Sequence, residues 1–89
     1  MDFKHENNRI TAYDESEELG FLSYMPDGEV LTVDHTEVSP QAEGQGLGKQ
    51  LVEQIVQYAR KEDKQLDPQC PFAQAVIEKY SEFQDVVNK

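Results

Sequence analysis

The sequence predicts an α+β domain in which helices pack on a mainly antiparallel β-sheet. As far as Val38 the chain alternates polar and apolar residues between short turn-forming segments, which is typical of strands joined by hairpins. From Leu47 to Tyr58 apolar residues recur every three or four positions, which is typical of an amphipathic helix. Three glycines at alternate positions separate these two halves. A chain of 89 residues is expected to form one domain, residues 1–89, with a thin core.

The first half is predicted to be a meander of strands. A strand or a strand pair covers Phe3–Asp14, with Asn7-Asn8 as the turn if there are two. Further strands follow at Leu19–Met25 and Glu29–Val38. The segment Pro26-Asp27-Gly28 is the tight turn between them, because proline presets φ and glycine accepts a positive φ.

The second half begins with the amphipathic helix. Its apolar stripe starts at Leu47 and predicts a helix to about Glu62, or about 15 residues and roughly 23 Å. The segment Lys64–Asp67 is then a short link or a strand. As a strand it is expected to return parallel to Glu29–Val38, because a helix joins the two by a crossover connection.

A second helix is predicted over Phe72–Tyr80. Pro71 suits its first position, because the N–H that proline lacks would have no helical partner there. This places Cys70 at or next to the N-cap of the helix. Ser81–Gln84 has the spacing of a capping box and predicts a last short helix that ends at Val87.

The charge of the chain limits its partners. It has 8 basic and 18 acidic residues, a net charge of −10 at pH 7, so we do not expect nucleic acid as a partner. A cationic partner, such as an amine, is favoured instead. The N-terminus has no apolar segment of the kind found in a secretory signal. No apolar run approaches the roughly 18 residues needed to span a bilayer. The single cysteine cannot form an internal disulfide, so we expect a cytoplasmic protein. We also expect a monomer or a weak homodimer, since a thin core can gain stability from a partner subunit.

The glycine turn between strand and helix is a candidate anion site. Glycines admit close backbone approach, and the first turn of a helix presents unpaired N–H groups with a partial positive charge. A Walker A loop is excluded, because Glu43 stands at its first glycine position and Gln50 at its Ser or Thr position. The dinucleotide fingerprint G-x-G-x-x-G is excluded by the spacing Gly44-x-Gly46-x-Gly48. From the glycines alone, a plain, tightly packed turn between strand and helix is about as probable as an anion-binding turn.

The context of the turn favours a functional interpretation. The run Glu43–Lys49, E-G-Q-G-L-G-K, resembles the pyrophosphate-binding motif of the GNAT superfamily of N-acetyltransferases, which usually begins with Arg or Gln. The flanking segments His35–Val38, Pro68–Phe72 and Ile77–Val87 are similar to the small stand-alone YjdJ-like branch, which has His-Pro where this chain has Tyr80-Ser81. The resemblance covers most of the chain, from about Leu31 to Val87.

The resemblance implies a minimal GNAT-like fold, in which a strand, a glycine-rich turn and a helix form the coenzyme site. The implied activity is transfer of an acetyl group from acetyl-coenzyme A, as co-substrate and without a metal, to a primary amine of a small molecule, a polyamine or a lysine. A coenzyme A-binding or protein-interaction module with little or no turnover is the alternative, because the branch lacks the helices that cover the acceptor in larger members. An acidic structural partner protein without a small ligand is a third possibility.

The implied coenzyme site combines the end of a strand, the glycine turn and the second helix. The strand backbone would pair with the pantetheine arm, and the turn would hold the pyrophosphate. The cofactor-binding residues implied in this way are Glu37, Val38, Ser39, Glu43, Gly44, Gln45, Gly46, Leu47, Gly48, Lys49, Pro71, Phe72 and Tyr80.

Two residues are candidates for catalysis. Cys70 lies at a helix N-terminus, which stabilises a thiolate, so it could accept the acetyl group or line the thioester pocket; a buried, inert cysteine is the alternative. His35 lies near the end of its strand and could take a proton from the attacking amine, since imidazole titrates near neutral pH. Strand alternation places it on the face of Leu31 and Val33, so a packed, hydrogen-bonded histidine is about as probable.

Overall fold

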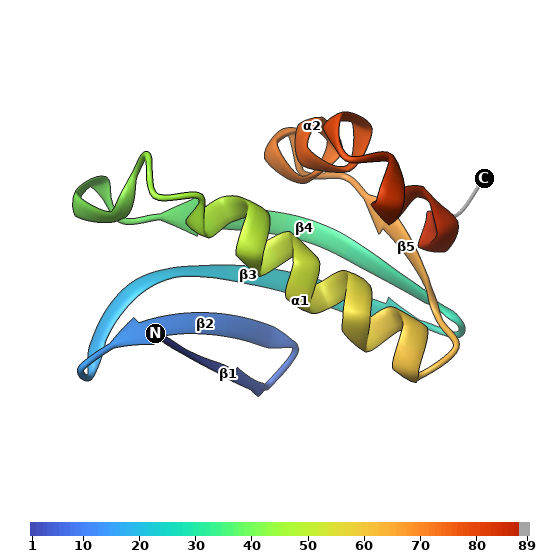
Figure 1. The fold of residues 1–89 in the computed structure, drawn as a ribbon. Coiled ribbons are helices and arrows are strands. Elements are labelled where there is room, and N and C mark those ends of the chain that lie inside the picture. Colours follow the sequence, from blue (N-terminus) through green and yellow to red (C-terminus); the bar gives the residue numbers. More distant parts are fainter. Residues whose placement is uncertain (88–89) are drawn as a thin grey trace.

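The computed structural model describes residues 1–87, which form a five-stranded sheet with helices packed on it (Figure 1). The strand order is β1-β2-β3-β4-β5, antiparallel except for the last pair, which is parallel. This confirms the predicted α+β class and the mainly antiparallel sheet. In chain order the elements are β1 Asp2–Glu6, β2 Arg9–Asp14, β3 Glu17–Asp27, β4 Val30–Val38, the 3-10 helix η1 Pro40–Ala42, α1 Leu47–Lys61, β5 Gln65–Pro68, α2 Pro71–Lys79 and the 3-10 helix η2 Ser81–Val86.

The strands before the glycine turn form a four-stranded meander. The first predicted segment is a strand pair, β1 and β2, that turns at Asn7 and Asn8, both with positive φ. The turn predicted at Pro26-Asp27-Gly28 lies one to two residues later, at Gly28 and Glu29, and β3 continues through Pro26. A proline is tolerated there because β2 ends opposite Ser23, so no strand on that side needs its missing N–H.

A β-bulge in β4 reverses the faces of its second half. Tyr24 of β3 pairs with Val33 and Ser23 with His35, so Asp34 is the extra residue. The Ser23 hydroxyl donates a hydrogen bond to the Asp34 carboxylate at 2.7 Å. The prediction that His35 shares a face with Leu31 and Val33 is therefore wrong, because one inserted residue moves every later side chain to the other face.

The core lies between one face of the sheet and α1. The helix has the predicted length of 15 residues, and its apolar stripe includes Leu51, Val52, Ile55 and Val56, all without solvent exposure. Their partners include Ile10, Leu22 and Leu66. The side chains on the opposite face of β2–β4, which we call the open face, are mostly exposed or half-buried, except for the buried Thr11; they include Arg9, Phe21, His35 and Glu37.

The C-terminal elements pack beside β5 (Figure 1). β5 runs parallel to β4, and α2 begins at Pro71 with Cys70 as its N-cap, as predicted. The predicted capping box is wrong: Ser81 is the first residue of η2, no side chain caps this helix, and Gln84 donates to the Ile77 carbonyl at 2.6 Å. Within residues 1–87, no helix is long and apolar enough to cross a membrane.

Candidate functional site

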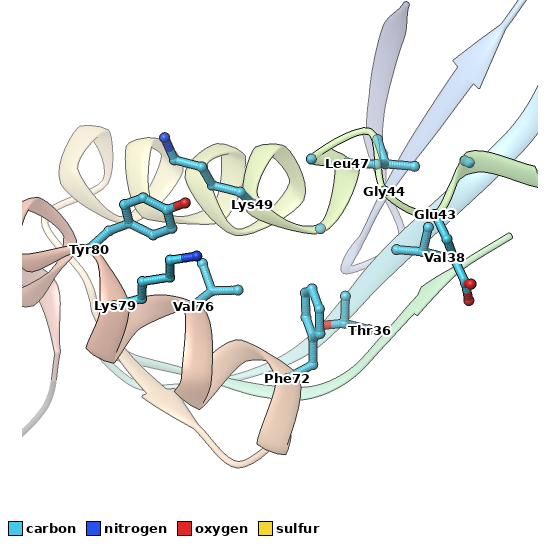
Figure 2. Close-up of a pocket in the computed structure, with 13 residues that line it drawn as sticks. Thr36, Val38, Glu43, Gly44, Leu47, Lys49, Phe72, Val76, Lys79 and Tyr80 are labelled. Atoms are coloured by element: carbon cyan, nitrogen blue, oxygen red, sulfur yellow. The ribbon is translucent and has the colours of Figure 1, made fainter. Parts of the chain in front are cut away.

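The glycine turn borders a cavity of about 510 Å³, which we call the cleft (Figure 2). The cleft lies between the second half of β4, the start of α1 and one side of α2. Nine of its residues are cofactor-binding residues implied by the sequence: Val38, Glu43, Gly44, Gly46, Leu47, Gly48, Lys49, Phe72 and Tyr80. The others are Thr36, Ala42, Val76 and Lys79.

The cleft exists because β4 and β5 separate. They pair only from Val30 to Val33, where the Val33 carbonyl accepts hydrogen bonds from the backbone N–H groups of Gln69 and Cys70 at 3.0 and 3.1 Å. Beyond this point β4 continues to Val38 while the chain after β5 turns into α2. The gap between them leaves side chains of β4 as one wall of the cleft.

The start of α1 is arranged to accept an anion. Gly44 and Gly46 have φ of 82° and 75°, and a Cβ at either would touch nothing, so glycine is favoured there for its backbone conformation. Gly46 is the N-cap and has no side chain to cap the helix. Among the described residues, the first three N–H groups of the helix donate to no backbone carbonyl. The first turn also has no acidic residue, although the chain has 18 of them. Such a helix start binds anions through its N–H groups and its dipole.

Gly48 is a glycine for a different reason. Its Cα lies against the ring of Phe72, and a Cβ built there would be 2.0 Å from Cζ of that ring. Phe72 itself is 41% exposed, so its ring covers the start of α1 without belonging to the core. This contact joins the two helices, and Figure 2 shows the Phe72 ring between the two ends of the cleft.

Two lysines surround the ring of Tyr80 at the other end of the cleft. Lys49 Nζ lies 4.3 Å and Lys79 Nζ 5.6 Å from the ring centroid. Sequence reasoning included Lys49 and Tyr80 and missed Lys79, because one exposed lysine in a short helix looks like any other. Only the packing of α2 beside α1 brings it to the cleft.

Glu43 is the one acidic residue that lines the cleft. A carboxylate beside a bound pyrophosphate would weaken binding if it faced the phosphates. Figure 2 shows the Glu43 carboxylate directed outward, away from the lysines and the helix start. Its side chain is exposed, so the chain tolerates glutamate at this motif position.

Cys70 lies beneath the cleft, with 7% of its surface exposed. Burial raises the pKa of the Cys70 thiol, but polar groups around it outweigh this effect, so that its pKa lies below the ordinary value. These groups are the Ala73 N–H, the Thr36 hydroxyl, and the N–H groups of Phe72 and Thr36. The Thr36 hydroxyl is buried and reaches hydrogen-bonding geometry with no described group, so it acts on the sulfur as a nearby dipole.

The pKa of the Cys70 thiol in the folded protein is therefore expected to be lower than the pKa of the same thiol in the unfolded chain. A titration followed by the ultraviolet absorbance of the thiolate measures this, with Cys70→Ser as the blank for the tyrosines. Because the folded-state pKa is lowered, the stabilisation by this group is complete above the unfolded pKa and is lost as the pH falls through the folded value. A midpoint in the folded protein above that of the protein unfolded in denaturant would show that burial dominates.

The remaining predicted residues lie outside the cleft. His35 is on the open face, 3.6 Å from the Glu37 carboxylate, with 59% of its side chain exposed. Glu37 and Ser39 instead line a smaller cavity of about 250 Å³, and Gln45 and Pro71 line neither cavity. Their roles in binding or catalysis stay predictions. No group of three metal-ligating side chains lies together within residues 1–87.

Fold and cleft together define a class of protein. It is a small α+β protein whose cleft has an uncapped helix start and two lysines suited to an anionic ligand, and it has a buried free cysteine nearby. The profile of the GCN5-related N-acetyl-transferase family matches residues 9–86. The chain belongs to this family, as its motifs predicted, and is therefore an enzyme of the acetyltransferase class.

Solved structures agree with this assignment. A GCN5-like candidate N-acetyltransferase from Staphylococcus aureus shares 32% identity over 98% of this chain and 87% of its own, with a TM-score of 0.80. The ribosomal-protein-S18-alanine N-acetyltransferase of Escherichia coli shares 18% over 84% of this chain and 53% of its own, with a TM-score of 0.71. The IAA acetyltransferase of Bacillus cereus shares 18% over 80% of this chain and 51% of its own, with a TM-score of 0.66. The last two show the fold alone, and this chain spans about half their length. No curated protein matches the chain significantly.

Proposed function

We propose that the cleft binds acetyl-coenzyme A and that the protein transfers the acetyl group to a primary amine. The observation that carries this proposal is the uncapped, acid-free start of α1 beside two lysines, in a chain of net charge −10. Such a chain repels anions in general, so a local concentration of donors and cations argues for one specific anionic ligand. The diphosphate would bind the N–H groups of the helix start, and no metal would take part.

The pantetheine arm would run along the second half of β4, past Thr36 and Val38, toward Cys70. The amine nitrogen then attacks the thioester carbonyl, a C–N bond forms and the C–S bond breaks. The coenzyme leaves as a thiolate and takes a proton, while the attacking nitrogen loses one. We assign the proton that the nitrogen loses to His35, whose Nε2 lies 3.6 Å from a carboxylate oxygen of Glu37.

Cys70 has two possible roles in this reaction. It could accept the acetyl group as a thioester and pass it to the amine, which its lowered pKa supports, or it could line the site while the amine attacks directly. Intact-mass measurement after brief exposure to acetyl-coenzyme A separates them. An acetyl adduct that Cys70→Ser abolishes supports covalent transfer, and undiminished transfer by Cys70→Ser supports direct attack.

The acceptor class follows from charge. The negative chain favours a cationic amine, which could belong to a small molecule, a polyamine or a protein lysine. We further propose that the 89 residues act as one domain, as a monomer or weak homodimer, in the reducing cytoplasm, which the single free cysteine supports.

The alternative is a coenzyme A-binding or protein-interaction module with little turnover. The observation that favours it is the exposure of the open face: the His35 side chain is 59% exposed, and the Glu37 side chain beside it is 65% exposed. A module of this kind would bind the coenzyme and present it, or its acetyl group, without a formed acceptor pocket.

Two measurements test the proposal. Isothermal titration with acetyl-coenzyme A is expected to show saturable one-to-one binding, and no binding at millimolar ligand would reject the coenzyme site. Release of free coenzyme thiol is then followed with assorted amines, comparing the wild type with His35→Gln. Amine-dependent release above the rate without amine supports the enzyme, whereas binding without it favours the module.

A further inference from the structure

The end of the cleft opposite the glycine turn carries two ammonium groups close together. Lys49 Nζ and Lys79 Nζ lie 4.3 and 5.6 Å from the centroid of the Tyr80 ring, so they are at most about 10 Å apart, the sum of these distances. Within residues 1–87, the basic side chains in ion pairs are Lys4, Arg9, His35 and Arg60, so neither lysine of the cleft has a carboxylate partner.

This arrangement is unfavourable without a ligand. Lys49 is in the first turn of α1, where the helix dipole disfavours a cation. A second ammonium group nearby adds repulsion, since no carboxylate lies between them to offset it. Lys61 and Lys64 also form no ion pair within residues 1–87, so the distinguishing feature is the place of Lys49, at the positive end of the α1 dipole and beside a second ammonium group. Proteins place cations at a helix start or beside one another mainly at functional sites, because elsewhere nothing compensates for the repulsion.

Lys49 belongs to the first turn of α1, but its ammonium group and that of Lys79 lie near the Tyr80 ring, away from the glycine turn. Figure 2 shows Lys49, Tyr80 and Lys79 at one end of the cleft and Gly44 and Glu43 at the other. A ligand that satisfies both ends needs two separate phosphate groups. Coenzyme A has this chemistry: a diphosphate, and a phosphomonoester on the 3′ position of its ribose.

We propose that Lys49, Tyr80 and Lys79 form a subsite for the 3′-phosphate of coenzyme A, and that Lys79 makes the cleft selective for it. This subsite rests on the proposed coenzyme binding. A phosphomonoester carries nearly two negative charges at pH 7, enough to neutralise both ammonium groups at once. The Tyr80 ring lies within cation–π distance of both ammonium groups and so helps to keep them near one another.

The experiment compares coenzyme A with 3′-dephospho-coenzyme A by isothermal titration of the wild-type protein at low salt. We expect the dephosphorylated ligand to bind at least about tenfold more weakly, because it loses the charge-assisted contacts of one phosphate. The ratio should shrink as salt is added, since both lysines are near solvent.

Lysine variants locate the effect. Lys79→Gln and Lys49→Gln are expected to weaken coenzyme A several-fold each, to leave dephospho-coenzyme A almost unchanged, and together to abolish the discrimination. Glutamine keeps the helix propensity of lysine, so folding is preserved and can be checked by thermal melting. Lys61→Gln is the matched control, a lysine in the last turn of α1 outside the cleft, and should change nothing.

The outcomes are distinct. Equal affinity of the wild type for both ligands would overturn the subsite and leave the proposed function standing. Discrimination that survives in the double variant would overturn the assignment to these lysines. Failure of both ligands to bind would reject the proposed function, and the subsite with it.

Discussion

Replacing Gly48 with alanine is expected to weaken coenzyme binding while the fold stays intact. The new Cβ would lie 2.0 and 2.4 Å from two ring atoms of Phe72, so the ring must move. Phe72 is 41% exposed and can turn on its side-chain bonds, so the backbone need not shift. Alanine also favours a helix over glycine by up to about 1 kcal/mol, which offsets part of the strain. The displaced ring then changes the middle of the cleft.

The expected loss of affinity is about 5- to 150-fold, because the ligand must push the turned ring back into an overpacked contact, which typically costs about 1–3 kcal/mol. Titration with acetyl-coenzyme A measures it, and the melting temperature reports the fold. Gln57→Ala, on the exposed side of the same helix, is the control and should change neither. In the double variant Gly48→Ala with Phe72→Ala the clash is absent, so affinity should lie above that of Gly48→Ala alone.

Unchanged affinity in Gly48→Ala would contradict the assignment of this cleft to the coenzyme. A large fall in melting temperature would instead mean that the Phe72 ring is part of the fold. The two readouts therefore separate a binding role of this contact from a structural one.

The glycine turn and the helices were predictable from sequence because their signals are local. The spacing of apolar residues from Leu47 gave α1 its length, and Pro71 marked the start of α2. The parallel return of β5 follows from the crossover rule. The two helices depend on residues within a turn or two of one another, and the direction of β5 depends on a general rule of chain connection.

The face of His35 was not predictable, because a β-bulge has no reliable signature in side-chain types. The extra residue, Asp34, looks like any polar strand residue, and only its pairing across β3 reveals it. One inserted position moved His35 and Glu37 to the open face and turned Thr36 toward the cleft. Errors of one residue in register therefore matter more for a site than for a fold.

Lys79 and Thr36 were missed for a related reason, since each acquires its position from tertiary packing. Lys79 meets Lys49 across Tyr80 because α2 lies beside α1, and Thr36 meets Cys70 because β4 and β5 separate after Val33. No short-range pattern encodes either contact. The motif predicted the cleft to which we assign the coenzyme, and the structure was needed to find the lysine that we propose selects it.

The largest expected loss of stability is that of Leu51→Ala. Leu51 is fully buried in α1 at the centre of the core, and alanine leaves a cavity beneath the helix. Such changes cost about 2.7–5 kcal/mol, against a total of about 5–15 kcal/mol for a domain. In a chain of this size each kcal/mol lowers the melting temperature by about 4–8 °C, so we expect a fall of roughly 10–40 °C.

Calorimetry or circular dichroism measures this fall, with Met25→Ala, which is 62% exposed, as the control within about 0.5 kcal/mol of the wild type. Acetyl-coenzyme A at 100 times its Kd should restore about 2.7 kcal/mol to Leu51→Ala by mass action, because this variant keeps the cleft residues. At the same ligand concentration Gly48→Ala should gain less, since its affinity is lower. Equal effects of Leu51→Ala and Met25→Ala would contradict the packing of α1 on the sheet. Equal rescue of Leu51→Ala and Gly48→Ala would place the coenzyme away from the contact between Gly48 and Phe72.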